Sequence, residues 1–380
     1  MTARGSDPVA AADNVYSAYT ALALRTGAVN LGQGFPDDPA PADILERART
    51  AIADGLNQYP PTRGVSDLRE AVSGHQLRRY GVHLDPRHEV VVTTGASEAI
   101  TATLLGLLRP GDEVLLIDPC YDLYPHAVRL VGGRAVHVSD VSALARSVTP
   151  RTRAIVINSP GNPSGEILSR EEIHEVGTLA QRYDLVVISD EVYEHIVLGA
   201  TSHICAHEEP LLGDRTVVVS SAAKTFCVTG WKVGWATGPR WLIDEVHRVK
   251  QYLSFASGTP FQYAVAAALE NPEVYTQYLC RSYRDRCDLL TGALERFGYT
   301  VSKPDGGYFV LADAAPLGVV STEDLHRHCE SLPRDVGIVG IPGSVFSESS
   351  VSTVRFCFAK SRERVEEACS RLDHSSAKRT

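Results

Sequence analysis

Residues 152–193 read TRAIVINSPGNPSGEILSREEIHEVGTLAQRYDLVVISDEVY, and this stretch decides the fold class. It contains two short apolar runs, at 152–158 and 185–193, which have the length and the β-branched content of buried strands. Between them, residues 169–183 have the spacing of a helix, opened by Ser169 with a glutamate at the capping-box offset. Two strands joined through a helix predict a parallel pair in a sheet whose faces are covered by helices.

The same alternation extends on both sides of this stretch. Because short, continuously apolar strands that alternate with helices are typical of α/β proteins, we expect a large α/β domain with a mainly parallel seven-stranded sheet flanked by helices. The five additional strands are expected at 89–95, 112–119, 134–139, 216–224 and 231–238. Helices are expected at 42–56, 64–80, 97–108, 122–131, 240–253, 261–269 and 272–297.

The two ends of the chain are expected to form a smaller α+β domain. Its elements are a helix at 11–26, strands at 306–313, 336–343 and 353–359, a helix at 322–332, and a last helix to about 372 with a frayed tail at 374–380. A chain of 380 residues exceeds one hydrophobic core. We therefore divide it into 1–41 (N-terminal arm and part of the small domain), 42–285 (large domain) and 286–380 (C-terminal small domain).

Composition and charge exclude several classes of function. The formal net charge is −9 without a basic run, which argues against binding to nucleic acids or to an anionic membrane surface. The longest apolar runs have strand length, and residues 1–14 lack the apolar core of a secretory signal, so we expect a cytoplasmic protein. Eight scattered cysteines without a CxxC pair indicate reduced thiols, and the histidines show no metal-ligand pattern, so no metal site is expected.

Polar residues follow five of the expected strands at their carboxyl ends. Ligands of open α/β sheets bind outside this edge, so these residues are expected to share one site. Taken singly, each segment has an ordinary explanation, such as a helix cap or a turn. The five segments are Gly95-Ala96-Ser97, Asp118-Pro-Cys-Tyr121, Asn158-Ser-Pro-Gly-Asn162, Asp190-Glu-Val-Tyr193 and Ser221-Ala-Ala-Lys224.

Together these segments match the needs of one cofactor, pyridoxal phosphate. Its aldehyde needs a lysine amine, and its ring nitrogen needs an anion. Its phenolic oxygen needs hydrogen-bond donors, its ring face an aromatic side chain, and its phosphate backbone amides with hydroxyls and a cation. The expected sheet edge offers each of these groups once, including a helix N-terminus for the phosphate. The sequence therefore predicts a pyridoxal-phosphate site.

Residues 221–235, SAAKTFCVTGWKVGW, resemble the Schiff-base segment of the class I/II aminotransferases of fold type I. The resemblance is closest to the branch that holds kynurenine aminotransferase/glutamine transaminase K and the methionine aminotransferases. Further matching segments stand in family order over nearly the whole chain, namely NLGQGFPD (30–37), LNQYPPTRG (56–64), NSPGNPSG (158–165), SDEVYEH (189–195) and VRFCFAK (354–360). The resemblance implies an enzyme that exchanges the amino group between an L-amino acid and a 2-oxo acid.

The resemblance also implies the roles of residues around the cofactor. Lys224 would carry the cofactor as a Schiff base and shuttle the substrate proton, with Asp190 and Tyr193 completing the catalytic set. Asp190 would pair with the pyridinium N–H, where a charge interaction is strongest when water is excluded. The implied cofactor-binding residues are Ala96, Ser97, Tyr121, Asn162, Asp190, Tyr193, Ser221, Lys224 and Lys232, together with Tyr59.

Substrate binding and assembly follow from the same resemblance. Arg355 would hold the substrate α-carboxylate through two parallel hydrogen bonds, which lysine could not reproduce. Gly34, Asn162 and Tyr16 would complete the substrate site, with Gly34 allowing a close approach of the backbone. In this family, Tyr59 reaches the phosphate held by the other subunit, and segment 255–259 lies near the same site, so a homodimer with shared active sites is implied.

Two departures from the branch affect specificity. Ser97 stands where the branch often has an aromatic residue, and the loop between Pro342 and Arg355 is short and rich in serine. Neither kynurenine nor methionine specificity is therefore assumed.

Several other functions are possible. The same fold and cofactor would also support β-elimination or an oxidase-type reaction on an amino acid. A non-catalytic regulator is disfavoured because too few residues precede position 30 for a winged helix. A nicotinamide-binding Rossmann enzyme is disfavoured because TTGASEA, at 93–99, replaces the glycine-rich GxGxxG motif.

Overall fold

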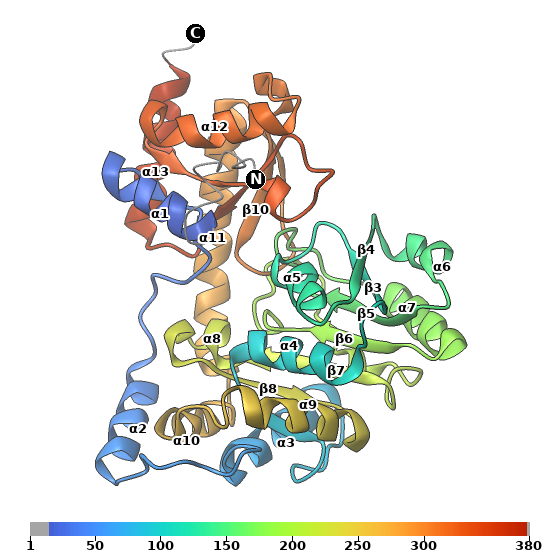
Figure 1. Ribbon diagram of the computed structural model, residues 1–380. Coiled ribbons are helices and arrows are strands. Elements are labelled where there is room, and N and C mark those ends of the chain that lie inside the picture. The colour runs from blue at the N-terminus through green and yellow to red at the C-terminus, as the bar shows by residue number, and fades with distance from the viewer. Residues whose placement is uncertain (1–14, 378–380) are drawn as a thin grey trace, which may run out of the picture. The chain divides into compact units, whose positions relative to one another are not determined.

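The computed structural model describes residues 15–377, and these form two compact units (Figure 1). The larger unit comprises residues 39–281 together with 305–307, and the smaller unit comprises the other described residues. Residues 305–307 belong to the larger unit although the residues on both sides of them belong to the smaller one, and this was not predicted. The domain boundaries expected at 41/42 and 285/286 stay predictions, and the expected start of the first helix at 11 lies outside the described residues.

The larger unit is built on the predicted seven-stranded sheet, with the strand order β2-β8-β7-β6-β5-β3-β4. Strand β8 is antiparallel to both of its neighbours, and the run from β7 to β4 is parallel throughout. The mainly parallel arrangement is therefore confirmed. The strands are β2 (Val90–Thr94), β3 (Glu113–Ile117), β4 (Arg134–Val138), β5 (Thr152–Asn158), β6 (Val186–Asp190), β7 (Thr216–Ser221) and β8 (Val233–Thr237).

Helices cover both faces of this sheet because successive strand residues point to opposite sides. In β3, Val114 and Leu116 pack into one apolar cluster with α4, α5 and α9, whereas Leu115 packs on the opposite face with α7. Near β2 and β8, that opposite face is covered by α2, α3 and α10. The helices are α2 (Ala42–Ala53), α3 (Ser66–Tyr80), α4 (Gly95–Leu107), α5 (Leu123–Leu130), α6 (Leu144–Ser147), α7 (Arg170–Tyr183), α9 (Arg240–Leu253) and α10 (Thr259–Ala268).

The predicted capping box at the start of α7 is confirmed. The Ser169 hydroxyl accepts a hydrogen bond from the Glu172 N–H, and the Glu172 carboxylate accepts one from the Ser169 N–H at 2.8 Å. These bonds satisfy backbone donors that the first helical turn leaves open. A local sequence signal thus defines where this crossover helix begins.

The smaller unit contains an antiparallel sheet with the order β12-β13-β10-β9, and a parallel pair of β1 with β11. Strands β1 and β9 were not predicted, and the run expected at 336–343 is divided into β11 and β12. Its strands are β1 (Val29–Asn30), β9 (Thr300–Ser302), β10 (Phe309–Asp313), β11 (Ile338–Val339), β12 (Ile341–Pro342) and β13 (Thr353–Cys357). Its helices are α1 (Val15–Thr26), α12 (Thr322–Asp335), α13 (Arg362–Ser376) and the later part of α11 (Glu273–Phe297).

The expectation of a frayed tail from 374 onward is wrong for residues 374–376. These residues continue α13, and the Ser376 hydroxyl donates to the Leu372 carbonyl at 3.0 Å. Helix α12 also continues beyond 332, because Pro333 is accommodated inside the helix. Within residues 15–377, no helix combines the length and apolar content needed to span a bilayer.

Candidate active site

The larger unit brings most of the predicted cofactor residues to one edge of its sheet. Asn158 and Asp190 are paired neighbours at the ends of β5 and β6, and Ser221 ends β7. Strand β8 runs in the opposite direction, so it begins at this edge, and Lys232 directly precedes it. Thr94 ends β2 at the same edge, opposite the first residue of β8. The edge predicted to hold the ligand is therefore the edge where these side chains gather.

Lys224 and Asp190 come from neighbouring strands of this edge and interact electrostatically. Lys224 lies in the one-turn helix α8 (Ala222–Thr225), directly after β7. Burial raises the pKa of Asp190 to about 6, although the hydrogen bond from Tyr124 and the charge of Lys224 act in the opposite direction. The carboxyl is mostly ionised at neutral pH, and it is buried from water. It can therefore supply the anion that a protonated ring nitrogen requires.

Tyr124 is a functional residue that the sequence analysis missed. Its hydroxyl donates to Asp190 Oδ2 at 2.7 Å, while the Val192 N–H donates to Oδ1 at 3.3 Å. Burial and the nearby carboxylate raise the pKa of Tyr124 well above its usual range, so the phenol remains a donor. Tyr121 packs edge-on against Tyr124, with ring centroids 5.7 Å apart. The sequence offered one indication of this role: Tyr124 follows Tyr121 by three residues at the start of an expected helix, a spacing that puts both rings on one face.

The loop that carries Asn162 is tied to the strand that carries Asp190. The Asn158 side-chain amide donates to the Asp190 carbonyl at 2.8 Å, and its oxygen accepts from the Asn162 N–H at 2.7 Å. Tyr193 follows β6 in a turn in which its carbonyl accepts from the Ile196 N–H, and its side chain is buried. Asn162 and Tyr193 thus flank Asp190 on short segments that hydrogen bonds hold in place.

The start of α4 and Lys232 form a cradle for an anion. Gly95 has a φ of +75°, and a Cβ atom at this position would lie 3.2 Å from the Lys232 ammonium nitrogen. A Cβ atom on Gly234 would lie 2.8 Å from the Ala96 nitrogen, so both glycines permit a close approach of β8 to the helix start. The buried Thr94 hydroxyl has no hydrogen-bond partner among the described residues. A helix N-terminus, an ammonium group and an unsatisfied hydroxyl together fit a phosphate dianion.

These observations test whether pyridoxal phosphate fits the residues present. The sheet edge offers an amine at Lys224, a buried carboxylate at Asp190 and an anion cradle at Gly95 and Lys232, and all three come from adjoining strands. This donor set matches the aldehyde, the ring nitrogen and the phosphate of the cofactor. The residues therefore fit the group.

A buried network beneath the site was also missed by sequence reasoning. The Glu194 carboxylate accepts hydrogen bonds from the hydroxyls of Tyr80, at 2.7 Å, and Ser220. Although burial raises its pKa, the neighbouring histidines and hydrogen bonds hold the pKa of Glu194 well below its usual range. Burial lowers the pKa of His195 to about 3, and His195 Nδ1 lies 3.3 Å from the hydroxyl of Thr225, the residue after Lys224. One contact of this network, from His195, therefore reaches the residue that follows the lysine.

The smaller unit brings Arg355 and Tyr16 together among aromatic side chains. Arg355 is buried on β13, and its Nη2 donates to the Gly32 carbonyl at 2.9 Å. Its guanidinium carbon lies 4.0 Å from the ring centroid of Phe309, 4.5 Å from that of Phe346 and 5.6 Å from that of Tyr16. Rings stacked on a guanidinium restrict its orientation and reduce its contact with water. Phe309 and Phe346 were not predicted as site residues.

Gly34 lies in the same unit and is sterically required. A Cβ atom on this glycine would lie 2.5 Å from the ring of Phe309, and the Gly34 carbonyl accepts a hydrogen bond from the Tyr308 hydroxyl at 2.8 Å. Phe309 thus lies against both Arg355 and Gly34, and Tyr16 borders the same guanidinium. Asn162, the fourth predicted substrate residue, belongs to the larger unit.

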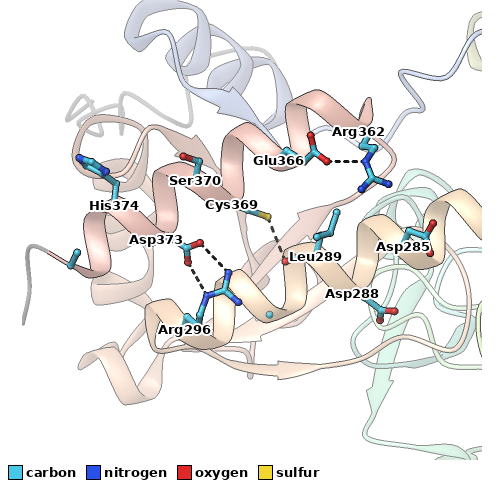
Figure 2. Close-up of a pocket in the computed structure, with 12 residues that line it drawn as sticks. Asp285, Asp288, Leu289, Arg296, Arg362, Glu366, Cys369, Ser370, Asp373 and His374 are labelled. Atoms are coloured by element: carbon cyan, nitrogen blue, oxygen red, sulfur yellow. Dashed lines mark hydrogen bonds and ion pairs between the residues drawn. The ribbon is translucent and has the colours of Figure 1, made fainter.

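Figure 2 shows a hollow in the smaller unit that contains none of the predicted site residues. It lies between α11 and α13 and has a volume of about 970 Å³. Its arginines are paired with carboxylates of the lining: Arg296 of α11 pairs with Asp373 of α13, and Arg362 pairs with Glu366 on α13 itself. No lysine among residues 15–377 lines the hollow, so these residues do not offer there the amine that the sheet edge of the larger unit provides.

Comparisons with known proteins agree with this chemistry. The sequence model of the family described as aminotransferase class I and II matches residues 26–372. The solved structure of N-succinyldiaminopimelate aminotransferase from Mycobacterium tuberculosis is 45% identical, with a TM-score of 0.92 over 96% of this chain and 97% of that chain. Methionine aminotransferase of Escherichia coli (strain K12) is 37% identical, over 94% of this chain and 95% of its own. Human kynurenine–oxoglutarate transaminase 3 is 34% identical, over 93% and 86% respectively.

Proposed function

The chain belongs to the class I and II aminotransferases and is a pyridoxal-phosphate-dependent transaminase, and from this premise we propose which residues do the chemistry and which substrate they serve. The observation that carries the proposal is the convergence of Lys224, Asp190 and the Gly95–Lys232 cradle at one sheet edge. The fold, the cofactor and the enzyme class expected from the sequence are confirmed. The comparisons do not favour the alternative of β-elimination or oxidation.

The family motifs, and the position of these residues at one sheet edge, support the following catalytic roles. Pyridoxal phosphate, when bound, supplies an aldehyde carbon for amines to attack and a ring that withdraws electrons from the substrate. The Lys224 amine would hold the cofactor at this carbon, and the same amine would move the proton of the substrate α-carbon. Asp190, held by Tyr124, keeps a proton on the ring nitrogen, and Asn162 and Tyr193 donate to the phenolic oxygen.

The remaining cofactor contacts use the ends of the same strands. The N–H groups of Ala96 and Ser97, the Ser221 hydroxyl and the Lys232 ammonium bind the phosphate. Tyr121 stacks on the ring, and its edge-on contact with Tyr124 supports this orientation.

Arg355 binds the carboxylate of the amino acid or the 2-oxo acid. Its burial, and the rings of Phe309 and Phe346 close to its guanidinium group, favour a strong bidentate pair because little water competes there. Tyr16 borders the same guanidinium, and Gly34 leaves the space that a side chain would fill. We assign these three residues to substrate binding.

We propose that the enzyme acts as a homodimer in which Tyr59 of one subunit contacts the phosphate bound by the other. Tyr59 and Tyr252 are 84% and 85% exposed, and Leu253 and Phe255 are also exposed. The rings of Tyr59 and Phe255 pack edge-on at 5.1 Å, so the exposed aromatics are contiguous. Exposed apolar surface of this kind is typical of an interface. Sedimentation should therefore give twice the mass of the chain.

We place the enzyme in the cytoplasm. All eight cysteines lie in the described residues, and none of them forms a disulfide. Thiols that stay reduced are typical of proteins from a reducing compartment. Fractionation of cells that express the protein at its natural level tests this location.

The substrate we propose is a long, polar amino acid of the N-succinyldiaminopimelate type, with a 2-oxo acid as the amino acceptor. The M. tuberculosis enzyme of that name is 45% identical to this chain. Ser97, where the branch often has an aromatic residue, leaves room beside the cofactor for a larger substrate.

A half-reaction screen tests this proposal. Holoenzyme is mixed with N-succinyldiaminopimelate, methionine or kynurenine in turn, and the visible absorption of the cofactor is followed as it bleaches. N-succinyldiaminopimelate is expected to react with the highest kcat/KM, and Ser97→Phe is expected to reduce this value while methionine is affected less. A higher kcat/KM for methionine or kynurenine overturns the substrate. Oxygen uptake with any of these substrates, or release of ammonia with pyruvate when a cysteine conjugate is offered, overturns the reaction type.

A further inference from the structure

Lys250 is a buried cation that no step of the proposed reaction uses. It lies in the last turn of α9 and is 0% exposed. Its ammonium group donates to the carbonyls of Thr62 and Phe255, both at 2.8 Å. Burial lowers its pKa to about 8, and a buried charge of this kind costs free energy unless strong hydrogen bonds compensate it. Packing alone therefore does not explain why a lysine occupies this position.

The two carbonyls belong to segments that are distant in sequence and adjacent in space. Thr62 follows Tyr59 in the segment between α2 and α3, and Phe255 lies between α9 and α10. The rings of Tyr59 and Phe255 meet edge-on, and the Thr259 hydroxyl donates to the Gln58 carbonyl at 2.6 Å. Lys250 thus bridges the backbone beneath the two rings that we propose lie at the subunit interface.

Helix α9 holds the segment that carries Tyr59 along one of its faces. Asp244 forms an ion pair with Arg63, and His247 Nε2 lies 2.8 Å from the Thr62 hydroxyl. Lys250 follows at the same three-residue spacing, so the three side chains share a face of the helix. Three side chains of α9 therefore hold the segment of Tyr59. Of the three, only Lys250 also donates to the Phe255 carbonyl.

The second segment connects Lys250 to the subunit's own phosphate cradle. The Ser257 hydroxyl donates to the Lys232 carbonyl at 3.0 Å, and the Ser257 carbonyl accepts from the Gln262 side chain at 3.0 Å. The same Gln262 accepts from the Val65 N–H at 2.9 Å. One hydrogen-bonded network therefore joins Lys232, which serves this subunit's cofactor, with the segment of Tyr59.

We infer that Lys250 is a positioning residue, which fixes Tyr59 and the 255–259 segment in the arrangement needed to complete the cofactor site of the other subunit. The inference rests on the proposed homodimer and the proposed cross-subunit contact of Tyr59. An ammonium group suits this role because it donates to several carbonyls at once, and its bonds are stronger than those of a neutral donor.

The test is a double-mutant cycle on cofactor binding. Lys250→Met, Tyr59→Phe and the double variant are prepared as apoenzymes, and the Kd for pyridoxal phosphate is measured together with Tm. Each single variant is expected to raise the Kd about tenfold, the size of effect that loss of a charge-assisted hydrogen bond produces. The Kd of the double variant is expected to be no higher than that of the single variant that binds the cofactor more weakly, because both changes remove the same contact.

Lys360→Met is the matched control. Lys360 is also buried, and its ammonium group donates to a carbonyl, that of Phe35, at 2.9 Å, but it lies in the smaller unit. This control is expected to lower Tm while the Kd for pyridoxal phosphate stays within about twofold. A similar rise in Kd for Lys360→Met would show that loss of a buried ammonium acts only through stability, and would overturn the inference.

Three other outcomes decide the matter. An unchanged Kd in Lys250→Met, or an additive loss in the double variant, overturns the inference while the Tyr59 contact stands. An unchanged Kd in Tyr59→Phe overturns the cross-subunit contact itself, and the inference with it. Should Lys250→Met not yield folded protein, Lys250→Gln, which keeps one donor, is measured in the same way.

Discussion

Replacing Tyr124 by phenylalanine tests the electrostatics of Asp190 with little change in packing. The phenol is buried and donates to the carboxylate at 2.7 Å. Phenylalanine removes this donor but keeps the ring that packs edge-on against Tyr121. The variant therefore isolates one hydrogen bond to the group that we propose pairs with the cofactor ring.

The size of the effect follows from the bond that is lost. A hydrogen bond to an ionised group contributes about 1.5–3 kcal/mol, and about 1.4 kcal/mol corresponds to one pH unit in a titration. The bond stabilises the ionised carboxyl, so its loss raises the pKa of Asp190 above its value of about 6. We expect the titration of cofactor binding to move upward by about 1–2 pH units, which leaves a large part of the carboxyl protonated at neutral pH.

The assay is a titration of apoenzyme with pyridoxal phosphate at a series of pH values, followed by visible absorbance. In the unmodified protein, affinity is expected to fall as the pH drops through about 6, because the protonated carboxyl no longer attracts the ring cation. In Tyr124→Phe the fall is expected at higher pH, with binding about two- to tenfold weaker at pH 7.

Tyr80→Phe provides the control for this experiment. It removes a phenol–carboxylate bond of the same 2.7 Å length, but at Glu194, which is not a proposed cofactor ligand. The control is expected to lower stability and to leave the titration of cofactor binding unchanged. If Tyr124→Phe also leaves this titration unchanged, the reasoning about Asp190 is refuted.

Three further substitutions test the remaining roles. Lys224→Ala is expected to abolish turnover and to remove the cofactor label that borohydride fixes in the unmodified enzyme; a label retained on another lysine would reject the assignment. Gly95→Ala is expected to lower the free energy of unfolding by about 1–2 kcal/mol because of the φ of +75°, which the Tm reports. It is also expected to weaken cofactor binding, measured by titration calorimetry, because its methyl group would crowd the Lys232 ammonium. Arg355→Lys is expected to raise KM for the amino acid and the 2-oxo acid alike, since lysine cannot form the bidentate pair; a steady-state KM that changes for one substrate only would show that Arg355 does not hold the shared carboxylate.

Much of the fold and the cofactor edge could be predicted because the signals are local. Short, largely apolar runs mark the seven strands, and a serine with a glutamate three residues on marks the start of α7. Once the strands are parallel, their carboxyl ends must meet at one edge, so Asn158 and Asp190 become neighbours without further information. Lys224 and Lys232 were placed by motif, and the structure puts them at the same edge.

The sequence by itself therefore determined the seven strands of the large sheet, the helices between them and the chemistry that gathers at the sheet edge, since hydrogen-bond periodicity and side-chain alternation act over a few residues. Only the tertiary structure decided the partners of Tyr124 and Lys250, because Tyr124 meets Asp190 across 66 positions and Lys250 meets Thr62 across 188. It also paired β1 with β11 and continued α13 to Ser376. The physical reason is that such contacts arise from the packing of whole elements, and no short-range pattern records which buried donor will meet which acceptor.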